Sequence, residues 1–396
     1  MKASRFELKL AVLAIAAFAA LCAFAGAASA VPQRPVCPGP ASAGSALCHA
    51  RVVTDAAGKP KAASAPKGYG PAEFHGAYGL PSSASSAQTI AIVDAFDDPK
   101  IANDLNTYSS QFGLPQCNKA NPCFEKVNQN GSATGPFPRS DSGWSLEIAL
   151  DVEVAHAICP SCKILLVEAS SNSLGNLAEA VNTAAKLGAD EISNSYGGGE
   201  YSSEANVTAY DHPGVAVTVS SGDSGYGSFG FPAAAPSVIA VGGTTLNLGT
   251  GNTYGSESVW SGSGSGCSLY LTASAWQSFL SACAGKRGVA DVAADANPST
   301  GAAVYDSVKY QGRSGWFKVG GTSLSSPLVA GVYALAGGLP SGTTAASGLY
   351  GHLGDASMLH DVTSGSNGSC STIMCKGAVG YDGPTGVGTP KGTGAF

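Results

Sequence analysis

The chain has 396 residues and a net charge of −6; only 12% of its residues are charged, while 53 are glycine. This length is ample for one large hydrophobic core or two small ones. The absence of any basic run argues against a nucleic-acid partner, and low charge with many small residues is typical of an exported, loop-rich protein.

The first 30 residues have the layout of a signal peptide. A basic start is followed by an apolar run over residues 10–26 and then by the small residues Ala28, Ser29 and Ala30. This order predicts cleavage after Ala30 and secretion of the rest of the chain. A membrane anchor is the alternative, but the run is short for a bilayer span, and no later stretch is long and apolar enough. We therefore expect no membrane association after cleavage.

Residues 31–68 are rich in Pro, Ala, Ser and Lys. This composition predicts a short leader or linker, either poorly ordered or laid as a strap across the surface. The folded domain is expected over residues 69–396.

The ten cysteines after Cys22 fall into five pairs that are close in sequence, which fits disulfides formed in an oxidising compartment. The expected pairs are Cys37–Cys48, Cys117–Cys123, Cys159–Cys162, Cys267–Cys283 and Cys370–Cys375. The Cys159–Cys162 pair has the spacing of a redox or zinc motif, but no second such pair and no suitably spaced histidine completes a metal set. A structural disulfide is the favoured interpretation.

Apolar strands alternate with helices from residue 89 onward. Strands are expected at 89–93, 164–167, 192–195, 215–219 and 238–241, and helices from Ile101 through Leu105, at 145–156 and near 174–187. This alternation predicts an α/β fold with a mostly parallel central sheet flanked by helices. Functional residues should then lie just beyond the carboxyl ends of the strands.

The helix that contains Glu147 is predicted to be amphipathic and capped by Ser142 or Ser145. Glu147 and Asp151 are four residues apart and share one helix face, where two buried carboxyls would repel each other and hold a proton between them. Such a pair is a plausible base for a serine hydroxyl below neutral pH. Glu153 points elsewhere, and we expect it on an ordinary solvent-facing surface.

Two further segments place reactive side chains at the ends of elements. Asp223 follows a buried strand and stands beside a glycine, where an Asp often only closes a turn. If it faced Ser323 and were protonated, it could donate a hydrogen bond to an oxyanion. Ser323 follows two glycines and precedes an apolar helix with Pro327 in its first turn. Backbone N–H groups at a helix amino terminus favour negative charge, so Ser323 is a candidate nucleophile, with a simple N-cap serine as the alternative.

A nucleophilic serine needs a base. The six histidines are His49, His75, His156, His212, His352 and His360. None of them lies in a Gly-rich turn that leads into a helix, as a subtilisin requires. The carboxyl pair is therefore the favoured base.

Taken in order, these segments resemble the sedolisin family of serine-carboxyl peptidases. The shared motifs are Glu147 and Asp151 on one helix, the run Ser221-Gly222-Asp223-Ser224-Gly225, and Gly321-Thr322-Ser323 followed by Pro327. The resemblance covers roughly residues 68 to 392. It implies a subtilisin-like three-layer fold and peptide-bond hydrolysis at acidic pH.

The resemblance also implies a role for each residue. Ser323 is the nucleophile, Glu147 the general base that later protonates the leaving amine, Asp151 its proton-sharing partner, and Asp223 an oxyanion donor beside the Ser323 backbone N–H. Ser195, Tyr196 and Gly197 would pair with the substrate backbone, with Tyr196 standing where the family commonly has Trp.

The family also binds one structural calcium ion near its carboxyl terminus, and residues 360–363 and 380–383 match that motif. The implied ligands are Asp361, Val362, Ala378, Gly380 and Asp382, with Ala378 where Gly is common. Carboxylates and backbone carbonyls are the oxygen donors that calcium prefers. A Gly-rich turn with incidental acids is the alternative.

The resemblance implies a secreted monomer that acts on proteins or peptides. Residues 31–68 are too few for the long folded propeptide that is usual in the family, so autoactivation is not assumed. Two alternatives remain open. One is a subtilisin-type enzyme with a histidine base and neutral to alkaline activity, and the other is a non-catalytic relative that serves as a surface or binding protein.

Overall fold

The structure is a computed structural model that describes residues 31–339, 342–343 and 346–396. The predicted signal peptide, residues 1–30, lies outside the described residues, so its cleavage stays a prediction. Within the described part of the chain, no helix has both the length and the apolar character needed to cross a membrane.

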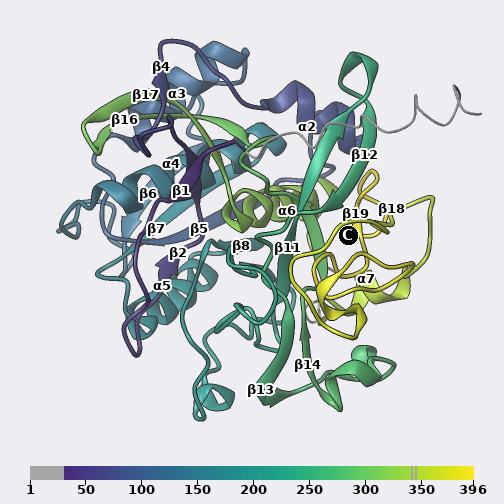
Figure 1. Ribbon diagram of the computed structural model, residues 1–396. Helices are drawn as coiled ribbons and strands as arrows, with labels where there is room; N and C mark the ends of the chain where they lie inside the picture. Colours follow the sequence, from purple (N-terminus) through teal and green to yellow (C-terminus); the bar gives the residue numbers. More distant parts are fainter. Residues whose placement is uncertain (1–30, 340–341, 344–345) are drawn as a thin grey trace, which may run out of the picture. The chain divides into compact units, whose positions relative to one another are not determined.

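A sheet of eight strands forms the centre of the fold (Figure 1). Its order is β12 (Tyr254–Val259), β11 (Ile239–Leu248), β10 (Ala216–Ser220), β8 (Glu191–Asn194), β5 (Thr89–Ala95), β7 (Lys163–Ala169) and β6 (Phe124–Asn128), with β15 (Val292–Asp295) also paired to β11. All of these pairs are parallel except β11–β12. The predicted mostly parallel α/β sheet is confirmed. Strand β11 extends well beyond the predicted 238–241, because its polar second half pairs with β12.

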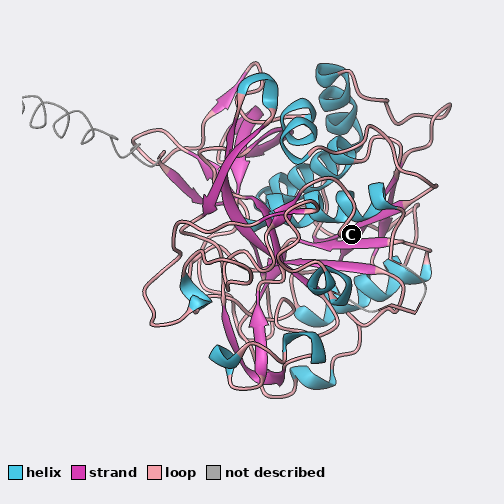
Figure 2. Ribbon diagram, turned by 90° about the vertical axis from the view of Figure 1, so that its right-hand side faces the viewer, coloured by secondary structure: helices cyan, strands magenta, loops and turns pink. Residues whose placement is uncertain are grey.

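Two buried helices pack on each other and against this sheet. They are α4 (Ser142–Ile158) and α6 (Thr322–Ala336), and both contact β5. Helix α3 (Ile101–Phe112) packs on α4, and α5 (Leu174–Lys186) packs on β5, β7 and β8. Figure 2 shows the helices gathered beside the strands. The shorter helices are α2 (Pro71–Tyr78) and α7 (Ser347–Gly351).

A second, antiparallel sheet lies against α4. Its order is β1 (Gln33–Pro35), β3 (Arg51–Val53), β17 (Arg313–Gly320) and β16 (Ala302–Tyr310), and β4 (Ala62–Ala63) also pairs with β17. Helix α4 contacts β5 of the central sheet and β16 of this one. Every residue from Gly143 to Ile158 is buried as a result. The predicted amphipathic pattern is therefore wrong, because a helix held between two sheets has no solvent face.

The N-terminal segment is an integral part of the fold. In Figure 1 its purple strands lie beside the green β16–β17 hairpin, although the two are far apart in sequence. A further strand, β2 (Leu47–Cys48), pairs with β9 (Tyr196–Gly197). The prediction of poor order is wrong, and the alternative of a strap across the protein is the observed one. The composition did not predict these strands, because they are held by backbone partners far along the chain rather than by an apolar pattern of their own.

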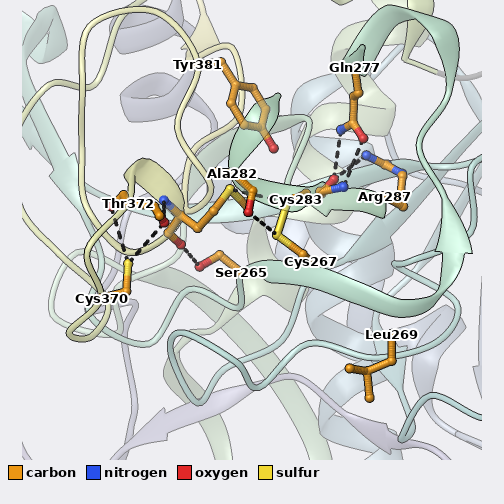
Figure 3. Close-up of a disulfide and its surroundings, with 12 residues drawn as sticks. Ser265, Cys267, Leu269, Gln277, Ala282, Cys283, Arg287, Cys370, Thr372 and Tyr381 are labelled. Atoms are coloured by element: carbon orange, nitrogen blue, oxygen red, sulfur yellow. Dashed lines mark hydrogen bonds between the residues drawn. A yellow bond between two sulfur atoms is a disulfide. The ribbon is translucent and has the colours of Figure 1, made fainter. Parts of the chain in front are cut away.

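All five predicted disulfides are present, each joining neighbours in sequence. Figure 3 shows the Cys267–Cys283 disulfide, which connects β13 (Gly266–Thr272) to the segment before β14 (Lys286–Val289), with Gln277 and Arg287 nearby. Near the carboxyl terminus, β18 (Leu359–His360) pairs with β19 (Thr389–Pro390). Short 3-10 turns occupy Glu204–Asn206, Thr250–Asn252, Ala275–Gln277, Ser281–Cys283 and Ile373–Cys375.

Candidate active site

Helix α4 is fixed at its first turn by Asp141. The Asp141 backbone is extended, and its Oδ1 accepts hydrogen bonds from the N–H groups of Gly143 at 3.0 Å and Trp144 at 3.2 Å. The prediction that Ser142 or Ser145 caps the helix is wrong, because the Asp141 carboxylate already satisfies these free N–H groups. The Ser145 hydroxyl instead donates to the Asp141 carbonyl at 3.0 Å.

Glu147 and Asp151 are completely buried on α4. Burial is the main reason why the pKa of each carboxyl lies well above its usual value, and the repulsion from Asp151 raises the pKa of Glu147 further. The nearby Ser323 hydroxyl opposes the rise in the pKa of Glu147. The nearby Ser195 hydroxyl does the same for Asp151. None of the four carboxyl oxygens accepts a hydrogen bond of ordinary geometry. Two buried acids in this state hold a proton between them.

A third carboxyl, Asp94, belongs to the same cluster and was not among the predicted site residues. It lies in β5, is completely buried, and has no hydrogen-bond partner on either oxygen. Burial, followed by repulsion from Asp151, raises its pKa well above the usual value. The signal was present in the sequence, because Asp94 directly follows an apolar strand at the end where functional residues were expected.

Ser323 is buried in the first turn of α6, as predicted. Gly321 caps this helix with φ of 99°, in the region that favours glycine. Pro327 lies in the second turn rather than the first, and it has no N–H to donate to the Ser323 carbonyl. The Ser195 hydroxyl supplies that donor at 3.3 Å, and the Ser323 hydroxyl donates in turn to the Ser195 carbonyl at 3.3 Å. These two bonds tie the end of β8 to the start of α6.

Asp223 lies in the loop after β10 and faces the start of α6. Its Oδ1 accepts from the Thr322 N–H at 2.7 Å and from the Thr322 hydroxyl at 3.0 Å, while its Oδ2 has no partner. Burial raises the pKa of Asp223 to about 7, with the Thr322 donors and then Arg51 opposing the rise. A Cβ atom at Gly321 would lie only 2.5 Å from Asp223 Oδ2, so a glycine is needed for this approach.

Glu153 is not on a solvent-facing surface, which corrects the prediction. It is completely buried, and its Oε2 accepts from the Tyr305 N–H at 2.8 Å. Burial raises its pKa well above the usual value. The carboxyl links α4 to β16 because α4 lies between two sheets.

No described histidine side chain forms a hydrogen bond with Ser323. His49 comes nearest through its backbone, but its ring Nδ1 is bonded to the Ser220 hydroxyl at 2.8 Å. His75 and His156 bond to backbone carbonyls on other elements. The geometry therefore favours the carboxyl pair over a histidine as the base for Ser323.

The segment predicted to pair with substrate lies next to Ser323 and already has a partner. Tyr196 and Gly197 form β9, which pairs with β2 of the same chain, and the Ser195 carbonyl accepts from the His49 N–H at 3.1 Å. The Tyr196 side chain is buried, and its hydroxyl donates to Asn194 at 2.8 Å. The side chain therefore points into the core rather than toward a substrate.

The predicted calcium ligands lie together in loops near the carboxyl terminus. Asp382 Oδ2 accepts from the Ala378 N–H at 3.0 Å, and Asp361 Oδ2 accepts from the Gly380 N–H at 3.0 Å. Burial raises the pKa of Asp382 to about 7, and repulsion from Asp361 contributes. Among the described residues, no basic side chain forms an ion pair with either carboxyl. Two neighbouring carboxyls without a counter-charge, beside carbonyls such as that of Val362, are a donor set that fits calcium.

Comparison with known proteins now identifies the family. A family profile described as the subtilase family matches residues 132–346, more than half of the chain. The chain belongs to the subtilase family. The matched region contains all four predicted catalytic residues.

The similar curated proteins are of the sedolisin type, the family that the motifs implied. Sedolisin from Pseudomonas sp. is 30% identical over 86% of this chain, and kumamolisin from Bacillus sp. is 30% identical over 83%. Xanthomonalisin from Xanthomonas sp. is 29% identical over 83%. The chain spans 62%, 63% and 46% of the lengths of sedolisin, kumamolisin and xanthomonalisin, respectively.

A solved structure of the same type is also similar to this chain. Pseudomonas sedolisin, a serine-carboxyl proteinase complexed with two molecules of pseudo-iodotyrostatin, matches with a TM-score of 0.67 and 29% identity. The match covers 82% of this chain and 96% of that one. An S41 psychrophilic protease matches at 20% identity with a TM-score of 0.51, which supports the subtilisin-like fold alone.

Proposed function

We propose that this chain is a secreted serine-carboxyl endopeptidase that hydrolyses peptide bonds at acidic pH. The observation that carries the proposal is the surroundings of Ser323. Its hydroxyl lies near the buried Glu147 of α4, and the unpartnered oxygen of Asp223 lies beside Gly321, which caps the helix that carries Ser323. A nucleophile, a proton acceptor and two oxyanion donors are the parts that acyl transfer requires.

The roles follow from these positions. Glu147 takes the proton of Ser323 as Oγ attacks the substrate carbonyl, and it later returns this proton to the leaving amine. Asp151, four residues along the helix, shares the proton of the pair and keeps Glu147 in place as a positioning residue. The Ser323 N–H and protonated Asp223 donate to the oxygen that becomes negative.

The raised pKa values favour acidic conditions. A carboxyl with a pKa of about 7 is protonated below that pH, so Asp223 can act as a hydrogen-bond donor there and loses this ability above it. The Glu147–Asp151 pair needs one ionised member as the base, and burial keeps the second proton on the pair over the same range. A histidine base would give the opposite preference, because a histidine accepts protons only above its own pKa.

Secretion and a monomeric state complete the proposal. Five disulfides are typical of proteins that fold in an oxidising compartment, and residues 1–30 have the layout of an export signal. Proteins and peptides are the proposed substrates, bound along Ser195, Tyr196 and Gly197.

We also propose one structural calcium ion, held by the carboxyls of Asp361 and Asp382 and by the carbonyls of Val362, Ala378 and Gly380. Its chemistry would be electrostatic, because a divalent cation neutralises two neighbouring carboxylates. These residues belong to loops on both sides of Cys370 and Cys375. The ion would therefore stabilise the carboxyl-terminal loops rather than take part in hydrolysis.

The test of the peptidase function is hydrolysis of a denatured protein across a range of pH by wild type, Glu147→Gln and Ser323→Ala. We expect wild type to be active from about pH 3 to 5 and each variant to lose activity by at least about a thousandfold. Activity that peaks at alkaline pH would support a subtilisin-type mechanism instead. A wild type that hydrolyses no substrate at any pH would support the non-catalytic alternative.

A further inference from the structure

Three aspartates that take no part in the candidate active site gather where α3, α4 and β16 meet. These three elements contact one another (Figure 1). Asp98 lies in the loop between β5 and α3, Asp104 lies in α3, and Asp306 lies in β16. One oxygen from each carboxyl lies within 4.8 Å of the corresponding oxygens of the other two. The fold therefore brings acids from distant parts of the chain to one point.

This cluster of aspartates is buried and has no ion-pair partner. Asp98 and Asp306 are completely buried, and Asp104 is 2% exposed. Among the residues that the structure describes, no basic side chain forms an ion pair with any of the three. The amine of Lys126 donates to the Asp98 carbonyl at 3.0 Å, but its ion pairs are with two other acids, and Lys100 is exposed. Ionised together, the three carboxyls would repel one another strongly, because the protein interior screens charge poorly.

A backbone N–H group orients each of the three carboxyls. The Oδ1 atoms of Asp98 and Asp306 each accept from the N–H two residues further along the chain, at 2.7 Å. The Oδ2 atom of each is buried and accepts no hydrogen bond. Asp104 Oδ2 accepts from the Ser307 N–H at 2.8 Å. Carboxyls that are held in place by one oxygen and leave the other without a donor are arranged as the ligands of a cation are.

Glu153 of α4 adds a fourth carboxyl beside this cluster. Its Oε2 accepts from the N–H of Tyr305, the residue before Asp306, and its Oε1 is buried and has no partner. Burial, and then repulsion from the three aspartates, raises the pKa of Glu153 well above its usual value. The negative charge available at this point therefore comes from four segments of the chain, and one of them is the helix that carries Glu147.

The donor atoms indicate which cation fits. All three side chains of the cluster offer carboxylate oxygens, with no cysteine or histidine among them, which favours calcium over zinc or copper. Calcium binds oxygen at about 2.3–2.6 Å, so oxygens on opposite sides of one ion lie roughly 4.6–5.2 Å apart. Oxygens that lie within 4.8 Å of one another can therefore all reach a single calcium ion. Magnesium keeps several of its waters and suits a buried cluster less well.

We propose that Asp98, Asp104 and Asp306 bind a second calcium ion between α3 and β16, beside Glu153 of α4. The site is separate from the one proposed near the carboxyl terminus, and it does not depend on the peptidase function. Its ion would join the loop after β5, α3 and the second sheet through their carboxyls. Because α4 lies between these parts and carries Glu147, the ion would also help to hold the helix that supplies the proposed base.

The first experiment counts the calcium ions on the full chain by native mass spectrometry, after purification at about 1 mM calcium and about pH 7.5. Ser323→Ala is the parent protein, so that binding is measured without hydrolysis. We expect two ions on the parent, one on Asp306→Asn, one on Asp382→Asn and none when both changes are combined. Asp355→Asn is the matched control, because its carboxyl also accepts from a backbone N–H but has basic neighbours, and it should keep two ions.

The ion that Asp306→Asn loses decides this proposal. Its loss supports the proposal whether or not Asp382→Asn loses another, so the two calcium sites are judged separately. Equal counts in folded Asp306→Asn and in the parent would overturn the proposal. The asparagine keeps an oxygen that can accept from the N–H of residue 308, and circular dichroism checks its fold. Asp98→Asn keeps its acceptor in the same way and replaces Asp306→Asn if that variant does not fold.

The second experiment locates the effect of the ion by hydrogen exchange with calcium and with chelator. In the parent and in Asp382→Asn, removal of calcium should speed exchange in α3 and β16 by about tenfold when calcium is at about ten times its dissociation constant. In Asp306→Asn, exchange in these two elements should be the same in both buffers. A chelator that changes exchange in the parent only in the loops around Asp361 and Asp382 would overturn the proposal and leave the carboxyl-terminal site standing.

Discussion

At the scale of single residues, Asp223 is expected to set the alkaline limit of activity. Its pKa of about 7 means that the protonated fraction falls about tenfold for each pH unit above that value. In Asp223→Asn, the amide N–H remains a donor at every pH, and the amide oxygen can still accept from Thr322. We therefore expect the variant to keep its activity above pH 7, so that its rate relative to wild type rises by about tenfold at pH 8.

The measurement is kcat/KM on a short peptide from acid to alkaline pH. Asp141→Asn serves as the control, because Asp141 is also an Asp that accepts backbone hydrogen bonds, but it caps α4 and is not bonded to α6. It should keep the wild-type alkaline limit. An unchanged limit in Asp223→Asn would assign the group with the pKa of about 7 to another residue.

His49 is expected to make residues 46–53 bind less tightly over the start of α6 in acid. Burial lowers the pKa of the docked ring to about 4. The ring is bonded to the Ser220 hydroxyl and lies against Gly197, and Asp223 lies near the His49 carbonyl. The released ring has an ordinary pKa of about 6.5. Between these two values the released form binds a proton that the docked form does not, so docking weakens by about tenfold per pH unit as the pH falls.

Hydrogen exchange at residues 46–53 in the uncut Ser323→Ala background measures this effect. Protection, corrected for intrinsic exchange, should fall from about pH 6.5 to pH 4. In the same background, His49→Gln has no charge to gain and should show a flat profile. Equal slopes in the two proteins would contradict the prediction.

At the scale of elements, the start of α4 depends on Asp141. Because its carboxylate satisfies two N–H groups, Asp141→Ala should lower the free energy of unfolding by about 1 kcal/mol, and Asp141→Asn by less. Ser142→Ala is the matched control, since the exposed Ser142 caps nothing. Denaturant titration in the Ser323→Ala background avoids self-cleavage. An equal loss of stability in Ser142→Ala would instead support Ser142 as the cap, as the sequence predicted.

The carboxyl-terminal loops should depend on calcium. An ion that binds only the native state stabilises it, so a chelator should lower the melting temperature of Ser323→Ala by about 2–4 °C for each kcal/mol of binding energy lost. Asp382→Asn should weaken this response to chelator, whereas Asp355→Asn, whose carboxyl bonds to Ser357, should retain all of it. The readout is the response to chelator rather than the melting temperature itself. A wild-type response in Asp382→Asn would argue against the site.

The sequence predicted those elements whose signal is local. Asp223 and Ser323 each stand at the end of an apolar run in a glycine-rich turn, so their positions follow from neighbours within a few residues. The position of residues 46–53 could not be found in this way. Their strands are short, their side chains are unpatterned, and their partners at Gly197 and Gly320 are backbone groups far along the chain. Burial all around α4 was missed for the same reason, because the second sheet includes these N-terminal strands.

At the scale of the whole molecule, buried carboxyls should make the protein most stable in acid. Burial is the main cause that raises the pKa of Asp98 to about 7, Asp306 to about 8 and Glu168 to about 9. In the unfolded chain these groups titrate near pH 4. Without a bound ion, the native state therefore binds more protons than the unfolded state above about pH 4. The free energy of unfolding falls from that pH upward and levels off as the three groups ionise in the native state between about pH 7 and 9.

The expected slope is about 1.4 kcal/mol per pH unit for each extra proton that the native state holds. Unfolding of Ser323→Ala in denaturant with chelator at pH 5 and pH 8 measures it. Asp306→Asn keeps the oxygen that accepts from the Val308 N–H but cannot ionise, so it should show a smaller difference. A chain that is more stable at pH 8 than at pH 5 would contradict this account.

Residues 46–53 precede in the chain the active-site residues that they cover, which has a consequence for the order of folding. Residues 37–48 leave the ribosome before Glu147, Asp223 and Ser323 do. Their disulfide spans a separation of only 11 residues, so the loop can close while the catalytic domain is still unfolded. When α4 and α6 finally pack together, residues 46–53 are thus already available to cover the start of α6.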